Sequence, residues 1–199
     1  MKNIIYFDGA MGTMLQKNGL KAGELPELLN ITNPGLITDI HKQYIDAGCD
    51  ILKTNTFGAN SLKIKDYSVD EIISAAMKNA RAAAGDKLVA LDVGPTGKLL
   101  KPLGDLSFEV AYEIFSEIMR AGQNHGADLV LIETMSDTYE LKAAVLAAKE
   151  NTSLPVYTTV TFDEQGKLLT GGDVLSVVSL LEGLGVDAIG INCGLGPKQ

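Results

Sequence analysis

The stretch Leu129-Val130-Leu131-Ile132-Glu133 decides the fold of this chain. Four consecutive apolar residues are typical of a strand buried on both faces, as the strands of parallel sheets are. Gly126-Ala127-Asp128 precedes the stretch, as expected of a helix-to-strand turn. Residues 137–149 follow it with helical periodicity, and Ser136 or Asp137 can cap that helix. The pattern predicts a buried strand that ends in a carboxylate and is followed by a helix.

Five further apolar runs end in the same way, in a polar or reactive residue. They are residues 4–8, 51–55, 88–92, 157–163 and 188–193, which end in Asp8, Asn55, Asp92, Asp163 and Cys193. Helical patterns between the runs begin near residues 33, 68, 107, 137 and 173. Strict alternation with short returns favours a parallel sheet with right-handed crossovers.

Six strands and five helices make up about three quarters of an eight-fold barrel, which typically needs about 250 residues. We therefore predict an α/β fold of the (β/α)8 TIM-barrel type, incomplete in this chain, as one domain over residues 1–199. A doubly wound open sheet also fits the length. Against it, Asp8-Gly9-Ala10-Met11-Gly12-Thr13 has two glycines instead of the three of a pyrophosphate-binding turn.

The composition is that of a globular protein with a sizeable core, because 46% of its 199 residues are hydrophobic. A net charge of −8 without a long basic stripe argues against a nucleic-acid partner. No apolar stretch approaches the roughly 18–20 residues of a membrane helix. Two cysteines are too few for a disulfide framework. We expect a cytoplasmic protein with reduced thiols and no membrane partner.

Polar residues at strand ends predict one shared site, because the carboxyl ends of parallel barrel strands meet at one rim. Asp8 and the backbone amides after it can hold both ends of an amino acid, although Asp8 can also cap its own turn. Glu133 ends a buried run and needs a partner, either a bound ammonium or a neighbouring lysine or backbone group. Asn55 fits a substrate contact or a brace of its loop.

The remaining reactive residues divide into rim and non-rim positions. Cys193 shares the rim with Asp8 and Glu133, whereas Cys49 at a helix end is expected to be packing. Asp92 is expected to organise its turn, and Asp163 to lie in a solvated loop. His41 and His125 belong to helices away from the rim, so the sequence offers no Cys-His nucleophilic pair.

These motifs together resemble the homocysteine S-methyltransferase family, and most of all the amino-terminal homocysteine-binding domain of cobalamin-dependent methionine synthases. The resemblance spans the whole chain. It rests on residues 8–13, Glu27-Leu28-Leu29-Asn30, Thr54-Asn55-Thr56-Phe57, Gly94-Pro95-Thr96, Glu133-Thr134, Leu141-Lys142-Ala143-Ala144 and Gly190-Ile191-Asn192-Cys193.

The resemblance implies a barrel in which zinc, held by three thiolates, binds the homocysteine sulfur. It implies Cys193 as the first zinc ligand and Asp8 and Glu133 as the acids that hold the substrate ammonium. The amides of Gly9, Ala10, Gly12 and Thr13 would take the substrate carboxylate. The methyl donor is expected to be methylcobalamin or another donor, presented by another domain or protein.

The sequence departs from the family at its end. The other two zinc ligands of the family lie in a later Gly-Gly-Cys-Cys segment, which is not reached before Gln199. We therefore expect a truncated module with an incomplete zinc site, an open barrel edge that favours self-association, and no activity of the chain alone. Two alternatives stay open. One is a metal-free amino-acid-binding or oligomerising module, and the other is an aldolase-like enzyme with a Schiff base on Lys53.

Overall fold

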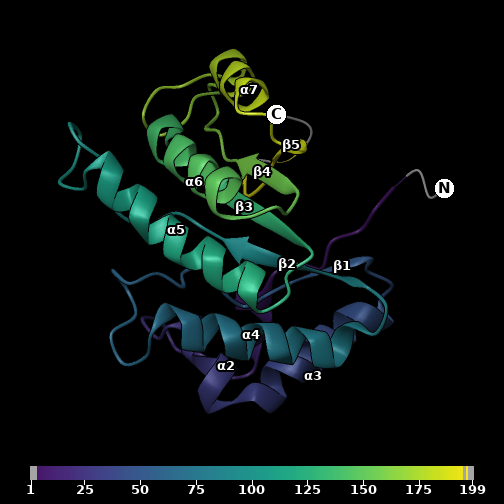
Figure 1. Ribbon diagram of the computed structural model, residues 1–199. Helices are drawn as coiled ribbons and strands as arrows, with labels where there is room; N and C mark the ends of the chain where they lie inside the picture. The colour runs from purple at the N-terminus through teal and green to yellow at the C-terminus, as the bar shows by residue number, and fades with distance from the viewer. Residues whose placement is uncertain (1–3, 195, 197–199) are drawn as a thin grey trace.

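The centre of the molecule is a parallel sheet whose strands follow the order of the chain (Figure 1). The structure is a computed structural model that describes residues 4–194 and 196. The strands are β1 (Ile51–Lys53), β2 (Leu88–Val93), β3 (Leu129–Met135), β4 (Val156–Val160) and β5 (Ala188–Ile191). A doubly wound sheet reverses its order at a switch point, whereas a barrel does not. The predicted α/β fold of the barrel type is confirmed as a partial barrel.

The first of the six predicted strands is reduced to a single bridge, which corrects the strand count. Phe7 pairs with Ile51 in parallel, and the amide of Asp8 donates to the carbonyl of Ile51 over 3.0 Å. The preceding side chains of Ile4, Ile5 and Tyr6 are all more than half exposed. This segment has one neighbouring strand among the described residues, so it cannot form the second ladder that a central strand has.

All five predicted helices are present within a few residues of their expected ends. They are α3 (Pro34–Asp46), α4 (Val69–Ala84), α5 (Phe108–Asn124), α6 (Thr138–Asn151) and α7 (Val174–Gly183). Each begins after a polar residue whose side chain accepts a backbone N–H of the first turn: Asn33, Ser68, Ser107, Asp137 and Asp173. Helices α4 to α7 follow one another along one side of the sheet (Figure 1).

Three short helices were not predicted: α1 (Met11–Lys17), η1 (Pro26–Leu28) and α2 (Leu29–Thr32). Gly12 and Thr13 therefore belong to a helix and not to a glycine loop. The helix forms because it buries Leu15 completely, in a cluster with Ile37 and Ile40 of α3. This apolar contact outweighs the poor helix propensity of Gly12.

The central strands β2 and β3 bury both faces over most of their length, and alternate residues pack on opposite sides. On β2, Val89, Leu91 and Val93 pack in the large cluster that includes residues of the covering helices. Ala90 belongs instead to the smaller cluster on the inner face of the sheet, together with Leu131 of β3.

The same alternation places charged residues at the carboxyl end of the inner face. Two positions after the inner residues Ile51, Ala90 and Leu131 come Lys53, Asp92 and Glu133. Ordinary strand geometry thus brings one cation and two acids to one end of the sheet.

Among the described residues, no helix is long and apolar enough to cross a membrane.

Candidate active site

A cavity of about 370 Å³ lies at the carboxyl end of the inner face. The predicted residues that line it are Asp8, Gly9, Ala10, Gly12, Asn55, Glu133 and Cys193, which come from separate parts of the chain. Thr13 is exposed in α1 and is not among the lining residues. The structure therefore brings together all the predicted site residues except Thr13.

Asp8 lines this cavity and has one carboxylate oxygen without a hydrogen-bond partner. Its Oδ2 accepts the backbone N–H of Lys53 over 3.0 Å, while its Oδ1 is buried without a hydrogen-bond partner. Burial raises the pKa of Asp8 to about 7, although the backbone hydrogen bond and the charge of Lys53 oppose the rise. A cation that entered the cavity would find an acceptor here whose hydrogen-bonding capacity is unused.

Glu133 is already paired in the structure, with Lys53. The two carboxylate oxygens lie 3.2 and 3.3 Å from Nζ, and both side chains are less than one fifth exposed. Of the two partners expected from the sequence, a lysine is the one observed. Burial alone would lower the pKa of Lys53, but the charges of Asp92, Glu133 and Asp8 outweigh it and raise the pKa. An amine held protonated is a poor nucleophile, which disfavours the Schiff-base alternative.

Asp92 does more than organise its turn. Its side chain lines the cavity and is buried, and its Oδ1 has no hydrogen-bond partner. Burial, followed by the nearby charge of Glu133, raises the pKa of Asp92 well above the ordinary value. Burial thus favours the protonated form of Asp92 relative to an exposed aspartate.

Asn55 has the geometry of a loop brace. Its amide donates to the carbonyl of Pro26 over 2.8 Å, and its backbone carbonyl accepts the side-chain amide of Asn30 over 2.7 Å. The Oε1 of Glu27 accepts the amide of Gly58 over 2.6 Å. The segment 27–30 thus fixes the loop after β1, and Asn55 lines the cavity with its amide nitrogen already engaged.

Cys193 lines the same cavity in a strained backbone conformation. Its φ is +50°, and that of the neighbouring Thr134 is +62°, both in the region that favours glycine. The hydroxyl of Thr134 lies 3.6 Å from the Cys193 Sγ and accepts the side-chain amide of Asn192 over 2.9 Å. Sequence reasoning did not single out Thr134 or Asn192, although both are polar residues directly beside a predicted strand end.

The described residues do not form a zinc site on their own. They contain no group of three or more histidine, cysteine, aspartate or glutamate side chains able to hold a metal, whereas a catalytic zinc has three protein ligands. Cys193 is exposed at the cavity, and Cys49 is buried in the helix-side core as expected. His41 lies buried in α3, and His125 follows α5 at 2.9 Å from Asp70, so both are away from the cavity.

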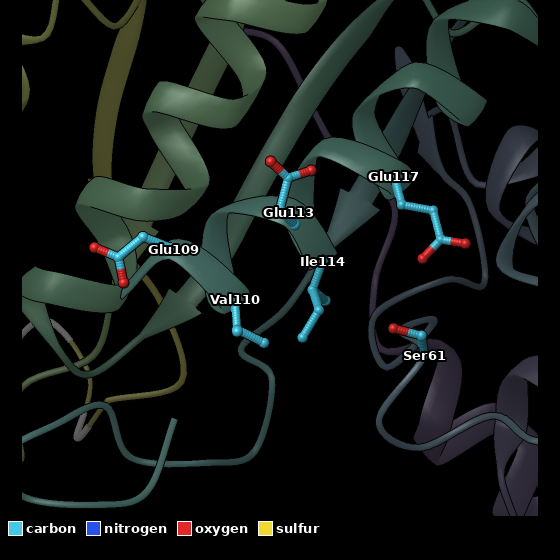
Figure 2. A pocket seen from close by; sticks show the side chains of 6 residues that line it. All are labelled: Ser61, Glu109, Val110, Glu113, Ile114 and Glu117. Carbon is cyan, nitrogen blue, oxygen red and sulfur yellow. The ribbon is translucent and has the colours of Figure 1, made fainter. Parts of the chain in front are cut away.

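A second hollow lies on the outer surface (Figure 2). Val110 and Ile114 of α5 line it together with Ser61, and Glu109, Glu113 and Glu117 stand along the same helix (Figure 2). The hollow shares no lining residue with the cavity at the strand ends. Glu109 and Glu113 are exposed and Glu117 is half-buried, as solvation of a surface helix explains, and no predicted site residue lies there.

Comparison with known proteins agrees with this geometry. The sequence model of the homocysteine S-methyltransferase family matches residues 5–199. The chain is 33% identical over 220 residues to the methionine synthases of Mycobacterium leprae and Mycobacterium tuberculosis. All of this chain is aligned, but it spans only 18% of each of those proteins.

A solved structure gives the same result. The metallated form of the homocysteine methyltransferase MmuM from Escherichia coli superposes with a TM-score of 0.83 at 26% sequence identity. The match covers 96% of this chain and 75% of that one. Family model, sequence relatives and superposed structure agree, and this chain belongs to the homocysteine S-methyltransferase family.

Proposed function

We propose that the protein transfers a methyl group to the thiol of homocysteine, giving methionine, and that the cavity at the strand ends binds the homocysteine. The observation that carries the proposal is the buried, unpartnered Oδ1 of Asp8 in the same cavity as the thiol of Cys193. The carboxylate suits the ammonium of an amino acid, and the thiol suits a metal ion that could bind the sulfur of the same ligand.

The parts of homocysteine can be assigned to this chain's residues. Its ammonium would bind Asp8, with Glu133 beside it. Its carboxylate would face the backbone of Gly9, Ala10 and Gly12, which line the same side of the cavity. Its sulfur would then point toward the rim that Cys193 occupies. In this orientation the strand ends hold the amino acid by its α-groups and leave the thiol open to a methyl donor.

Cys193 is proposed as one of three thiolate ligands of a zinc ion, the other two being supplied by residues outside this sequence. Zinc, when bound, keeps a substrate thiol deprotonated at neutral pH while the sulfur remains nucleophilic. The proposed donor is a methylated corrinoid such as methylcobalamin, or another methyl donor, presented by a separate domain or protein. We propose that the protein acts in the cytoplasm.

Replacement of Asp8 by asparagine tests the amino-acid site. The new side chain keeps the size and an acceptor for the Lys53 amide but loses the negative charge. Loss of one partner of a buried charge pair costs about 2–5 kcal/mol, so homocysteine should bind the full-length D8N variant at least about 30-fold more weakly by calorimetry.

Asp163→Asn is the matched control for this experiment, because Asp163 is an exposed aspartate that lies outside this cavity. The control should bind homocysteine like the unmodified protein. Equal affinities of all three proteins would show that Asp8 does not hold the substrate. Homocysteine binding that depends on Asp8 but is unchanged in metal-free protein would favour the metal-free binding module.

The pH dependence of binding offers a second test. An ammonium ligand binds the ionised form of Asp8, and the pKa of this carboxyl in the empty site is about 7. Below pH 7 the site must release a proton before binding, so the affinity for homocysteine should fall as the pH falls, by up to about tenfold per unit. Above pH 7 it should level off. Calorimetry at pH 6 in two buffers of different ionisation enthalpy should detect the proton that Asp8 releases. An affinity for homocysteine that does not change from pH 5.5 to 8 would contradict the assignment of Asp8 as the group that binds the ammonium.

A further inference from the structure

Lys53 is the basic residue that lines the cavity, and it is surrounded by acids. Its ammonium interacts with the charges of Asp92, Glu133 and Asp8, which come from three different segments of the sheet. Each of these residues stands at the end of an inner-face strand or at the Phe7 bridge. The strands, and not the loops, therefore determine the positions of these charged residues.

The Lys53–Glu133 pair separates two spaces. Both residues line the cavity of about 370 Å³, and both also line a second cavity of about 270 Å³. Phe7, Leu131 and Tyr157 border the second cavity, together with polar residues of β4. The ion pair thus stands between the two cavities, where both side chains are less than one fifth exposed and an unpaired charge would be costly.

Asp8 keeps an unpaired carboxylate oxygen next to the ion pair. Glu133 has both oxygens within 3.3 Å of the lysine ammonium and receives a longer contact of 3.5 Å from Asn192. Asp8 has one oxygen on the backbone N–H of Lys53 and the other without a hydrogen-bond partner. Glu27 and Asp92 also line the cavity with one unpartnered oxygen each, but Glu27 holds the loop amide of Gly58 over 2.6 Å, and burial raises the pKa of Asp92. The pairing with Lys53 thus occupies Glu133, whereas Asp8 keeps an acceptor for a ligand.

We propose that Lys53 is a positioning residue of the amino-acid site: its ammonium anchors Glu133 between the two cavities and leaves an oxygen of Asp8 to receive the ligand's ammonium. This inference rests on the proposed function for the identity of the ligand. The expectation that Asp8 and Glu133 hold the ammonium stays a prediction, and the inference adds that Glu133 is also held by the lysine.

Without the lysine, the acids would oppose one another. Asp8 would keep its neighbours Glu133 and Asp92, and it also faces Tyr44 of α3 and the buried Cys49, neither of which is a cation. Removal of the positive charge that acts on Asp8 leaves only the hydrogen bond from the backbone N–H of residue 53 to oppose burial and like charge, which favour the protonated form. A larger fraction of Asp8 would then be protonated and could not bind the ligand's ammonium as a carboxylate.

Lys53→Ala in the full-length protein tests this role. If the pKa of Asp8 rises by about one unit, homocysteine affinity should fall about tenfold at pH 6 but only about twofold at pH 8. Added propylammonium, which has the length of the deleted group, should restore the affinity, whereas 1-propanol should not. Lys53→Arg should retain most of the affinity. Lys149→Ala, which removes a lysine from an exposed pair with Asp187 at 3.2 Å, is the matched control.

Lys53→Met, which keeps the aliphatic bulk, replaces the alanine variant if that variant does not fold. Equal losses at pH 6 and pH 8, or equal rescue by 1-propanol, would assign Lys53 a packing role and overturn the proposal. If the unmodified protein binds no homocysteine, the proposed function fails. The role of Lys53 is then tested in the ligand-free protein, by the titration of the Asp8 carboxyl. Carbon-13 NMR of the Asp8 carboxyl, assigned with Asp8→Asn, should show its titration moving to higher pH in the variant; an unchanged titration overturns the proposal.

Discussion

Replacement of Cys193 by serine is expected to remove tightly bound zinc from the full-length protein and to abolish methyl transfer to homocysteine. The hydroxyl of serine is a far weaker zinc ligand than a thiolate. Loss of an outer partner of a zinc ligand already lowers metal affinity by about 10–100-fold. Loss of a ligand itself should therefore weaken zinc binding by at least about 100-fold, as measured by competition with a chelator.

The matched control is Cys49→Ala, because Cys49 is the other cysteine of the chain and is buried in the helix-side core. This variant should keep its zinc and its activity. Zinc content and activity that are unchanged in Cys193→Ser would remove Cys193 from the proposed ligand set. Equal loss in both variants would point to damage of the fold and not to a ligand.

Replacement of Phe115 by alanine should lower the free energy of unfolding by about 3–5 kcal/mol. Phe115 lies on α5 and is 0% exposed. By residue volume it is the largest of the fully buried side chains among the described residues. It belongs to the cluster that joins the helices to the sheet, so its removal leaves a cavity that surrounding side chains fill only in part. Urea denaturation followed by circular dichroism measures the loss.

Val110→Ala on the same helix provides the comparison, because Val110 is 48% exposed. It should change the free energy of unfolding by less than about 0.5 kcal/mol. A loss of less than about 1 kcal/mol in Phe115→Ala would contradict the packing described for α5. Any loss of the proposed methyl transfer in that variant should follow the fraction of protein that unfolds, because Phe115 is not among the residues that line the cavity at the strand ends.

The helices and their beginnings could be predicted from the sequence because their signals are local. Capping residues such as Ser68 and Asp173 lie directly before runs of apolar periodicity, and the structure contains the capping boxes. The placement of Asp8, Glu133 and Cys193 around one cavity could also be predicted, because the carboxyl ends of parallel barrel strands meet at one face.

What the sequence did not reveal depends on distant contacts. The helix α1 forms because it packs against α3, and residues 4–8 form only one bridge because they lack a second neighbouring strand among the described residues. The local sequence pattern predicted neither the helix nor the shortened strand. The pairing of Lys53 with Glu133 joins positions 80 residues apart. The alternation of side chains along a strand could have placed Lys53 and Asp92 on the inner face and so in the cavity. Their ionisation and their partners follow only from the folded sheet.

The left-handed backbone of Thr134 ties the thermal robustness of the protein to its chemistry. A β-branched residue at a φ of +62° costs on the order of 1–3 kcal/mol that glycine would not. Thr134→Gly is therefore an obvious change for an engineer who wants a hardier protein. The same change would delete the hydroxyl that lies 3.6 Å from the Cys193 sulfur and accepts the Asn192 amide. At this rim, gains in durability and preservation of the thiol's surroundings compete for a single side chain.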